Sequence, residues 1–264
     1  MTGAGEENHW SLPIANHIIG HRGSLFGGAG LAAGILALEE AAGKPVVWAT
    51  GQFLAPTQGD ITLDLAVKLP AVGRSVTQGR VLGKLDGHEI ITILGAAGKR
   101  PNRFAQITPT FPAPPTPLGC PVMERDSPSS MHNHVETRIA RGMFGWGARG
   151  TPHPDSMQLW LRLPEVEHDA AALAILADYN GGAIGNALGH AVGSTSLDNT
   201  IRYAAPVTDH PDDEWVLCDS RAEFVGNGFG MVTSQLWNQR GDLLAVASQS
   251  MIVREMPTSA PSAE

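Results

Sequence analysis

The sequence predicts an α+β fold in which one unit, a helix wrapped by antiparallel strands, occurs twice. In each half a glycine-rich helical segment is followed by strand-like segments joined by short turns, an order that does not suggest alternating βαβ units. In addition, Phe53-Leu54-Ala55-Pro56 and Tyr203-Ala204-Ala205-Pro206 share an aromatic, apolar, alanine, proline pattern 150 residues apart. We therefore expect an N-terminal copy over residues 1–100, a linker over 101–133, a C-terminal copy carrying the active site over 134–256, and a disordered tail over 257–264.

The first copy is predicted to begin with a helix over residues 27–43, after an opening dozen residues without an assigned element. The helical segment is rich in alanine and leucine, and Gly43 followed by Pro45 is a typical C-terminal stop. Asp86-Gly87 predicts a tight hairpin between the last two strands of this half. The strands expected to wrap the helix cover residues 46–54, 60–69, 75–85 and 89–97.

The middle of the chain has a different composition. Seven prolines between residues 101 and 121, without helical or strand periodicity, predict a linker. The second copy is predicted to contain a helix over residues 169–190 and, after it, a strand over 194–203 with one polar face. Its other strands are expected over residues 135–140, 157–163, 214–224, 230–238 and 243–254.

Length, charge and cysteine content exclude several classes of protein. A formal net charge of −8 over 264 residues argues against a general nucleic-acid binder, which needs a basic surface. The N-terminus carries Glu6 and Glu7 where a secretion signal is basic, and no run of about 18 apolar residues predicts a membrane span. The two cysteines, Cys120 and Cys218, do not suggest a disulfide framework. We expect a cytoplasmic protein with no nucleic-acid or membrane partner, no cofactor and no metal.

The second predicted helix carries the candidate chemistry. Its four glycines, at 181, 182, 185 and 189, each cost roughly 1 kcal/mol relative to alanine, so they indicate close approach of another backbone or of a ligand. Just before them, Asp178 interrupts an apolar run, and a carboxylate is costly to bury unless it is paired or used. Residues 175–206 are therefore the stretch around which we expect the site to be built.

Short motifs occur along residues 20–255 in a particular order. They are Leu25-Phe26-Gly27-Gly28, Phe53-Leu54-Ala55-Pro56, Trp160-Leu161-Arg162, Ser196-Leu197-Asp198, Glu214-Trp215-Val216-Leu217, and Gln249 on the last strand before Arg254. In order and spacing they resemble the motifs of the acyl-CoA thioesterase II family. The resemblance implies a double hotdog fold and hydrolysis of an acyl-CoA to CoA and a free carboxylic acid. It also implies a place in fatty acid metabolism and a homodimer or larger homo-oligomer.

The resemblance further implies three catalytic residues that hold and activate the attacking water. The matching positions are Asp178 on the second helix, Ser196 on the next strand and Gln249 on the last strand. Burial raises the pKa of a carboxyl group towards a value useful for a base, and N–H groups at a helix start can bind the oxygen that becomes negative. The residues expected to bind substrate are Gly181, Gly182, Phe26, Gly28 and Tyr203, and the backbone N–H groups near Gly181 and Gly182 are expected to bind that negative oxygen.

The two halves are predicted to differ in function. Shifted by 150 residues, Asp178 falls near Gly28 and Ser196 near Val46, so the first half lacks the polar groups and we expect one site per chain. Several positions depart from the family pattern and leave the acyl group undetermined: Ala55 and Ala205 stand in place of arginine, Ala204 and Asn199 in place of histidine, and Ala29 in place of glutamine. The CoA phosphates are expected near Arg141, Arg149 or Arg202.

Other interpretations remain at this point. A hotdog protein that binds or senses acyl-CoA without turnover is one, and a hotdog hydratase or dehydratase is another, although the helix pattern of the latter is not clear. Asp178 could also be a buried structural residue bonded to a serine. Gly28-x-Gly30-x-x-Ala33 lacks the preceding strand and acidic partner of a dinucleotide site, and no Gly-x-Ser-x-Gly elbow is present. His132-Asn133-His134 lies in the polar linker without a third metal ligand and predicts solvated side chains.

Overall fold

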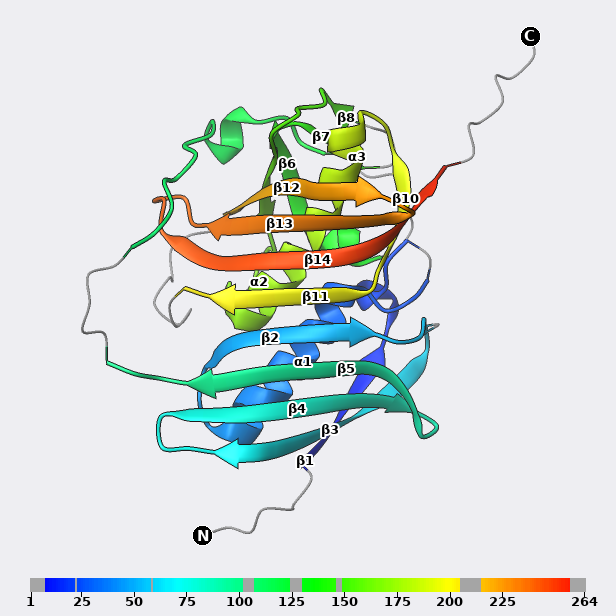
Figure 1. Cartoon of the computed structure of the whole chain (residues 1–264), viewed down its shortest axis with the longest axis vertical. Helices are drawn as coiled ribbons and strands as arrows, with labels where there is room; N and C mark the ends of the chain where they lie inside the picture. The colour runs from blue at the N-terminus through cyan, green and yellow to red at the C-terminus, as the bar shows by residue number, and fades with distance from the viewer. Residues whose placement is uncertain are drawn as a thin grey trace.

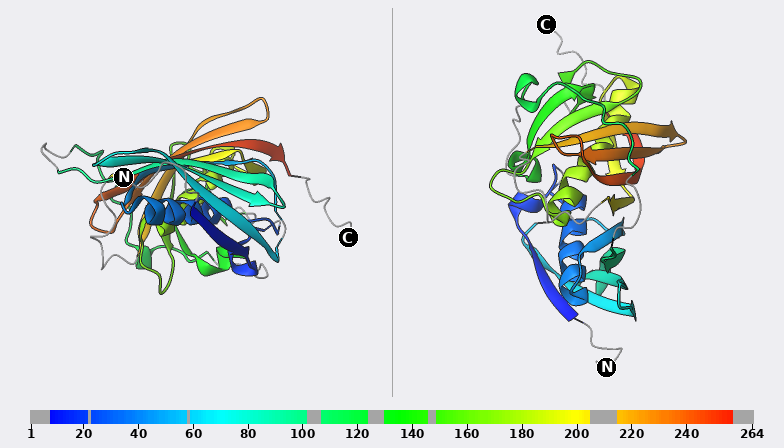
Figure 2. Two further views of the ribbon diagram at one scale, coloured as in Figure 1. Left: turned by 90° about the horizontal axis from the view of Figure 1, so that it is seen from below. Right: turned by 90° about the vertical axis from the view of Figure 1, so that its left-hand side faces the viewer.

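A computed structural model describes residues 8–21, 23–57, 59–101, 107–123, 130–145, 149–204 and 215–256. The expected disordered tail at 257–264, the residues Ala205 and Pro206, and the start of the strand predicted at 214 lie outside these ranges. One antiparallel sheet runs through both halves of the chain, and the helices lie on one of its faces (Figures 1 and 2).

The first half follows the predicted order closely. Helix α1 spans Gly27–Ala42 and ends because Gly43 adopts the left-handed conformation, with φ of 60°, and donates its N–H to the Glu39 carbonyl. The hairpin at Asp86 and Gly87 uses positive φ at both residues, 49° and 81°, as a two-residue turn of this kind requires. The strands are β1 (Asn8–Ile14), β2 (Val46–Phe53), β3 (Ile61–Val72), β4 (Val76–Leu85) and β5 (His88–Gly98).

Strand β1 was not predicted from the sequence. It pairs with β3 at the edge of the sheet, and the apolar residues Trp10, Leu12 and Ile14 alternate with polar ones. Pro13 interrupts the pattern, and an edge strand tolerates proline because one row of its backbone groups needs no partner. The period of two was present but short, and the proline concealed it.

In the described part of the second half, the helical segment is divided and forms no single long helix. The segment predicted as one helix over residues 169–190 is α2 (Ala170–Ala177), the 3₁₀ turn η4 (Asp178–Gly181) and α3 (Gly182–Leu188) in succession. A long-range contact accompanies the interruption: the buried Asn180 side chain donates to Ser234 of β13 (Phe229–Trp237) at 3.3 Å and ties η4 to the sheet. The strands are β6 (Glu136–Arg141), β7 (Met143–Phe144), β8 (Arg149–Gly150), β9 (Met157–Arg162), β10 (Val192–Ser196), β11 (Asp198–Tyr203), β12 (Val216–Gly226), β13 (Phe229–Trp237) and β14 (Leu243–Glu255), and the remaining short 3₁₀ turns are η1 (Asn16–Ile18), η2 (Pro117–Gly119) and η3 (Met131–His134).

The strand predicted over residues 194–203 is also divided in two. Both β10 and β11 pair with β14, but Ser196 lies opposite Met251 while Thr200 lies opposite Ser248, so the register shifts by one residue between them. Leu197, between the two strands, donates its N–H to the Ser250 carbonyl. The segment from β10 to β11 therefore has one more residue than the facing part of β14, which defines a β-bulge.

The two halves join through β2 and β11, which pair antiparallel in the middle of the sheet (Figure 1). The strand order is β1-β3-β4-β5-β2-β11-β14-β13-β12-β9-β6, with β10 added on β14. Thr50 lies opposite Thr200, and their hydroxyl oxygens are 2.6 Å apart. Gly28 and Asp178 also contact each other, and both pairs are separated by 150 residues in the sequence.

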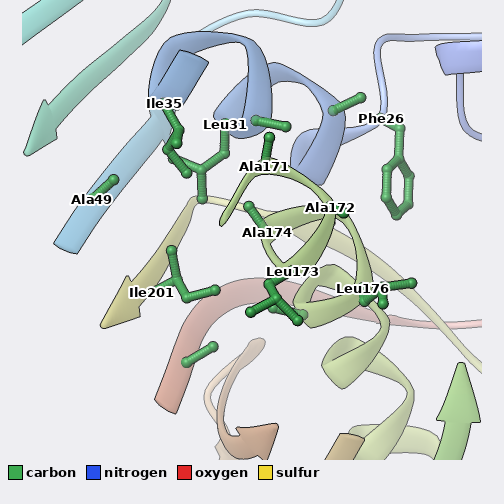
Figure 3. Close-up of a cluster of buried hydrophobic side chains, with 14 of the residues drawn as sticks. Phe26, Leu31, Ile35, Ala49, Ala171, Ala172, Leu173, Ala174, Leu176 and Ile201 are labelled. Atoms are coloured by element: carbon green, nitrogen blue, oxygen red, sulfur yellow. The ribbon is translucent and has the colours of Figure 1, made fainter. Parts of the chain in front are cut away.

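The core lies between the sheet and the helices. Helices α1 and α2 pack on each other above the β2–β11 junction, where Leu31, Ile35, Ala174, Leu173 and Ile201 are fully buried (Figure 3). Small residues allow this close approach: a Cβ on Gly28 would lie 2.9 Å from the Ala174 carbonyl oxygen. The helix contact thereby brings Asp178 next to the first turn of α1.

The described part of the proline-rich segment packs on the opposite face of the second half. Phe111 contacts the Trp237 ring with centroids 5.6 Å apart, and the Trp160 indole N–H donates to the Pro115 carbonyl at 2.9 Å. Cys120 is buried in the same cluster. No helix in the described ranges has both the length and the apolar character needed to cross a bilayer.

Candidate active site

A cavity of about 790 Å³ lies between the two halves. The first half contributes the N-terminal end of α1 and the end of β2, including Phe26, Gly27 and Phe53. The second half contributes Asp178 of η4, Ser196 of β10 and Gln249 of β14. The three residues predicted to be catalytic therefore meet in one place, although they are far apart in the chain.

Three N–H donors hold the Asp178 carboxylate. Its Oδ2 accepts from the Gly28 backbone N–H at 2.7 Å. Its Oδ1 accepts from Asn199 Nδ2 at 3.1 Å and from Gln249 Nε2 at 2.7 Å. An ionised carboxylate offers about four acceptor positions, so one position on Oδ2 is left for a further donor in the cavity.

Burial raises the pKa of the Asp178 carboxyl above its ordinary value, and the hydrogen bonds from Gly28, Gln249 and Asn199 partly offset that rise. The N-terminal end of α1, which carries partial positive charge, also lies against the carboxylate. The side chain is thus a stronger base than an exposed aspartate and still has donors that stabilise its charged form.

Gln249 connects Asp178 to Ser196. Its side-chain nitrogen donates both to Asp178 and to Ser196 Oγ, the latter at 2.9 Å, so both amide hydrogens are used. Since Ser196 accepts from Gln249, the hydroxyl hydrogen of Ser196 remains to be donated, and Ser196 lines the cavity. In this geometry Gln249 positions two groups, and Ser196 presents a donor to whatever occupies the cavity.

The sequence analysis did not assign Asn199 to the site. In a regular strand, residues 196 and 199 point to opposite faces, because the side-chain period is two. The one-residue register shift between β10 and β11 removes this conflict, so the side chains of Ser196 and Asn199 both join the hydrogen-bond network of Asp178. A bulge leaves no clear mark in a single sequence. The only signal at Asn199 was its departure from the histidine of the family pattern.

The residues predicted to bind substrate are distributed differently. Phe26, Gly181 and Gly182 line the cavity. Gly28 is not part of the lining and instead holds Asp178. Tyr203 is also away from the cavity, because its hydroxyl donates to the Ala170 carbonyl at 2.6 Å, so we no longer assign it to substrate binding.

The expected oxyanion role of Gly182 does not fit its geometry. Its N–H donates to the carbonyls of Tyr179 and Asn180 within η4, so it is already used. Its lack of a side chain has another reason, since a Cβ there would overlap the Phe144 ring. Gly182 thus allows Phe144 to lie against η4 and form part of the cavity wall.

A cluster of aromatic side chains forms the wall next to Asp178. Tyr179 stacks on Phe144 with centroids 5.9 Å apart, and the Tyr179 hydroxyl lies 3.2 Å from His132 Nδ1. His132 stacks on His21 with centroids 4.2 Å apart. The sequence analysis treated His132 as a solvated linker residue, which is wrong: it is partly buried and lines the cavity. Among the described residues, no group of three or more histidine, cysteine, aspartate or glutamate side chains is arranged to hold a metal.

Comparison with known proteins identifies the family. Residues 109–253 match the model of the acyl-CoA thioesterase C-terminal domain. The chain is 30% identical to a Novosphingobium aromaticivorans protein described as a thioesterase, with a TM-score of 0.78 over 92% of this chain and 94% of the other. A comparison with curated proteins found no match.

Two further structures share the fold. A hot dog fold protein of Alicyclobacillus acidocaldarius, of unknown function, has a TM-score of 0.79 at 20% identity over 97% of this chain and 96% of the other. An acyl-CoA thioesterase II of Mycobacterium marinum has a TM-score of 0.73 at 20% identity over 95% and 94%. The chain has a hotdog fold, and by its family match and its 30% identical relative it belongs to the acyl-CoA thioesterases and is a thioester hydrolase.

Proposed function

We propose that the protein hydrolyses acyl-CoA with a water molecule that Asp178 activates. The observation that carries the proposal is the state of the carboxylate: three donors fix it at the cavity, and one acceptor position on Oδ2 is left. A water bound at that position gives its proton to Asp178 as its oxygen attacks the thioester carbonyl. The tetrahedral intermediate then collapses and the C–S bond breaks. The proton on Asp178 passes to the departing sulfur, so CoA leaves as the thiol, the carboxylic acid is formed and the Asp178 carboxylate is restored.

Ser196 and Gln249 have separate roles in this proposal. Gln249 is a positioning residue, because both of its amide hydrogens go to Asp178 and Ser196. Ser196 donates its remaining hydrogen into the cavity, where it orients the water. No covalent enzyme intermediate is needed, since the base and the water act in one step.

The thioester carbonyl oxygen becomes negative during the attack and needs hydrogen-bond donors other than Gly182. We assign this role to the N–H groups at the N-terminal end of α1, because Gly27, the first residue of that helix, lines the cavity. Helix α1 has 16 residues, and its first N–H groups carry partial positive charge. The charge that develops in the transition state would then lie beside the same helix end that already holds Asp178.

We also propose that the chain is a double hotdog, with copies over residues 1–100 and 134–256 and the linker between them. Its support is the pair of contacts between residues 150 apart, Thr50 with Thr200 and Gly28 with Asp178. The site then belongs to the second copy but also uses α1, the helix of the first copy. The expected cytoplasmic location, role in fatty acid metabolism and homo-oligomeric assembly stay predictions.

The test is release of free thiol from short, medium, long and aromatic acyl-CoAs by wild type and by Asp178→Asn. Loss of the base is expected to lower kcat by about 10²–10⁴-fold. Asp64→Asn is the matched control, because Asp64 is an exposed carboxylate on β3 paired with His9. Turnover by Asp178→Asn within tenfold of wild type would contradict the mechanism. Binding of acyl-CoA by wild type without turnover of any substrate would instead indicate a binding protein.

A further inference from the structure

A second cavity lies beside the catalytic one. It has a volume of about 270 Å³ and shares Met123 and His132 with the larger cavity. Strand β6 contributes Glu136 and Arg138 to its lining, and Trp215 contributes another side. The hydrolytic step at Asp178 makes no use of this space.

Arg138 is the feature of this cavity that needs an explanation. Its guanidinium lies over the Trp215 ring, 5.4 Å from the centroid, and Nη1 donates to the Cys120 carbonyl at 3.0 Å. In the described part of the chain no carboxylate forms an ion pair with it. A guanidinium has five N–H donors, so most of its binding capacity is unused although the side chain is partly buried.

Glu136, the carboxylate in the lining of this cavity, is engaged by a cation other than Arg138. Arg162 lies over the same Trp215 ring, 4.9 Å from its centroid, so two cations share one indole. Glu136 stands directly opposite Arg162 in the β6–β9 register and pairs with it at 2.8 Å. Glu136 is therefore engaged by Arg162, and within the described ranges no carboxylate pairs with Arg138, so an anion beside Arg138 would gain a charged partner.

We propose that Arg138 binds a phosphate group of CoA, with the pantetheine arm passing Met123 and His132 to reach Asp178. The inference rests on the proposed function, since it places the CoA part of the same substrate. Every acyl-CoA carries these phosphates whatever its acyl group, and a guanidinium fork matches phosphate geometry. Arg138 shares its face of the sheet with Trp160, its partner in the β6–β9 register, and that face is opposite the one that carries Asp178. The arm would therefore pass around β6, the last strand in the sheet order, at Met123 and His132, which line both cavities. His132 also contacts Tyr179, the neighbour of Asp178.

The arginines expected from sequence for this role fit it less well. Arg141, Arg149 and Arg202 are absent from the lining of both cavities. The charge of Arg141 interacts with the Asp219 carboxyl. Burial raises the pKa of that carboxyl, and Gln158 and Arg141 both lower it. Arg202 is exposed on β11. Arg138 alone among these four combines a cavity with unused donors.

The experiment compares two substrates that share an acyl group, acyl-CoA and acyl-pantetheine, which lacks the phosphates. Arg138→Gln is expected to lower kcat/KM for acyl-CoA by roughly tenfold or more, mainly through KM, as loss of one charge-assisted contact does. The ratio of the two specificity constants should fall by the same factor. Arg80→Gln, at an exposed position on β4 in the other half, is the control and should keep the wild-type ratio.

Arg138→Lys separates a structural role from a binding role. It keeps the charge but loses the fork, so it should fold and show an intermediate ratio. An unchanged ratio in both Arg138 variants, or an equal loss for both substrates, overturns the proposal. If wild type hydrolyses neither substrate, the proposed function fails but the phosphate site is not yet refuted. The phosphate site is then tested by binding of free CoA to wild type and to Arg138→Lys. Equal affinity of the two proteins for CoA would also overturn it.

Discussion

Replacement of Gly28 by alanine tests whether the contact between the two halves builds the catalytic site. A Cβ on Gly28 would lie 2.9 Å from the Ala174 carbonyl oxygen, 2.9 Å from Asp178 Cβ and 2.9 Å from Ile175 Cα. None of these atoms is the end of a flexible side chain, so the helices must separate. Overpacking of this kind costs about 1–3 kcal/mol.

Gly30→Ala on the same helix is the matched control. A Cβ there would meet Ile91 Cδ1 and Leu25 Cδ2, each at 3.1 Å, and both are side-chain ends that can move. Both variants gain the same preference of alanine for helix, about 1 kcal/mol, so it cancels in the comparison. We therefore expect Gly28→Ala to be about 1–3 kcal/mol less stable than Gly30→Ala when the free energy of unfolding is measured in urea.

The same substitution should reduce activity, because Asp178 must move with the helix. Restoring ordinary contacts requires a shift of roughly half an ångström, and a 1 Å misplacement costs about 10²-fold, so kcat/KM should fall roughly tenfold. The assay is thiol release at a denaturant-free condition where both variants are folded by near-UV circular dichroism. If Gly28→Ala equals Gly30→Ala in both stability and kcat/KM, the account of how α1 holds Asp178 is wrong.

Three further predictions concern the groups around the site and the cysteines. Asn199→Ala removes a hydrogen bond that lowers the pKa of Asp178, so this pKa should rise. Because the reaction needs ionised Asp178, the acid limb of the kcat/KM profile should move to higher pH. An acid limb that does not move would exclude Asn199 from the network. The methyl group of Gly182→Ala would overlap the Phe144 ring and displace it, so the preference for acyl chain length should change. The measurement is the ratio of specificity constants across a series of acyl-CoAs. A proportional loss for all chain lengths would show that Phe144 does not limit the space for the acyl group. Burial raises the pKa of the Cys218 thiol to about 12, so this cysteine should not react with an aromatic disulfide reagent at pH 8 until the protein is unfolded, and rapid labelling of the native protein at Cys218 would contradict its burial.

Apart from β1, the elements of the first half were predictable because each had a local cause. Alanine and leucine form α1, Gly43 ends it, and Asp86-Gly87 makes the hairpin, so neighbouring residues contain the information. The break in the second helix was not predictable in this way. It depends on the contact of Asn180 with Ser234, 54 residues later, which no helical pattern reveals.

Asp178, Ser196 and Gln249, which we propose as catalytic, were inferred from motifs, and the structure brings their side chains together. What the motifs could not provide was the rest of the network. Asn199 reaches it only through a register shift, and Gly28 only because two helices cross there. His132 was missed for a similar reason, since its partners Tyr179 and His21 come from distant segments.

The contact of Gly28 with Asp178 has a consequence for symmetry. In the proposed duplication these are equivalent positions, and they meet each other as Thr50 meets Thr200. Two identical chains related by a twofold axis would place the same residue on both sides of this contact. Two aspartates there could not both ionise, and two glycines would provide no base. A carboxylate that faces a glycine across the axis therefore requires the two copies to differ, and a single chain carrying both copies allows them to do so.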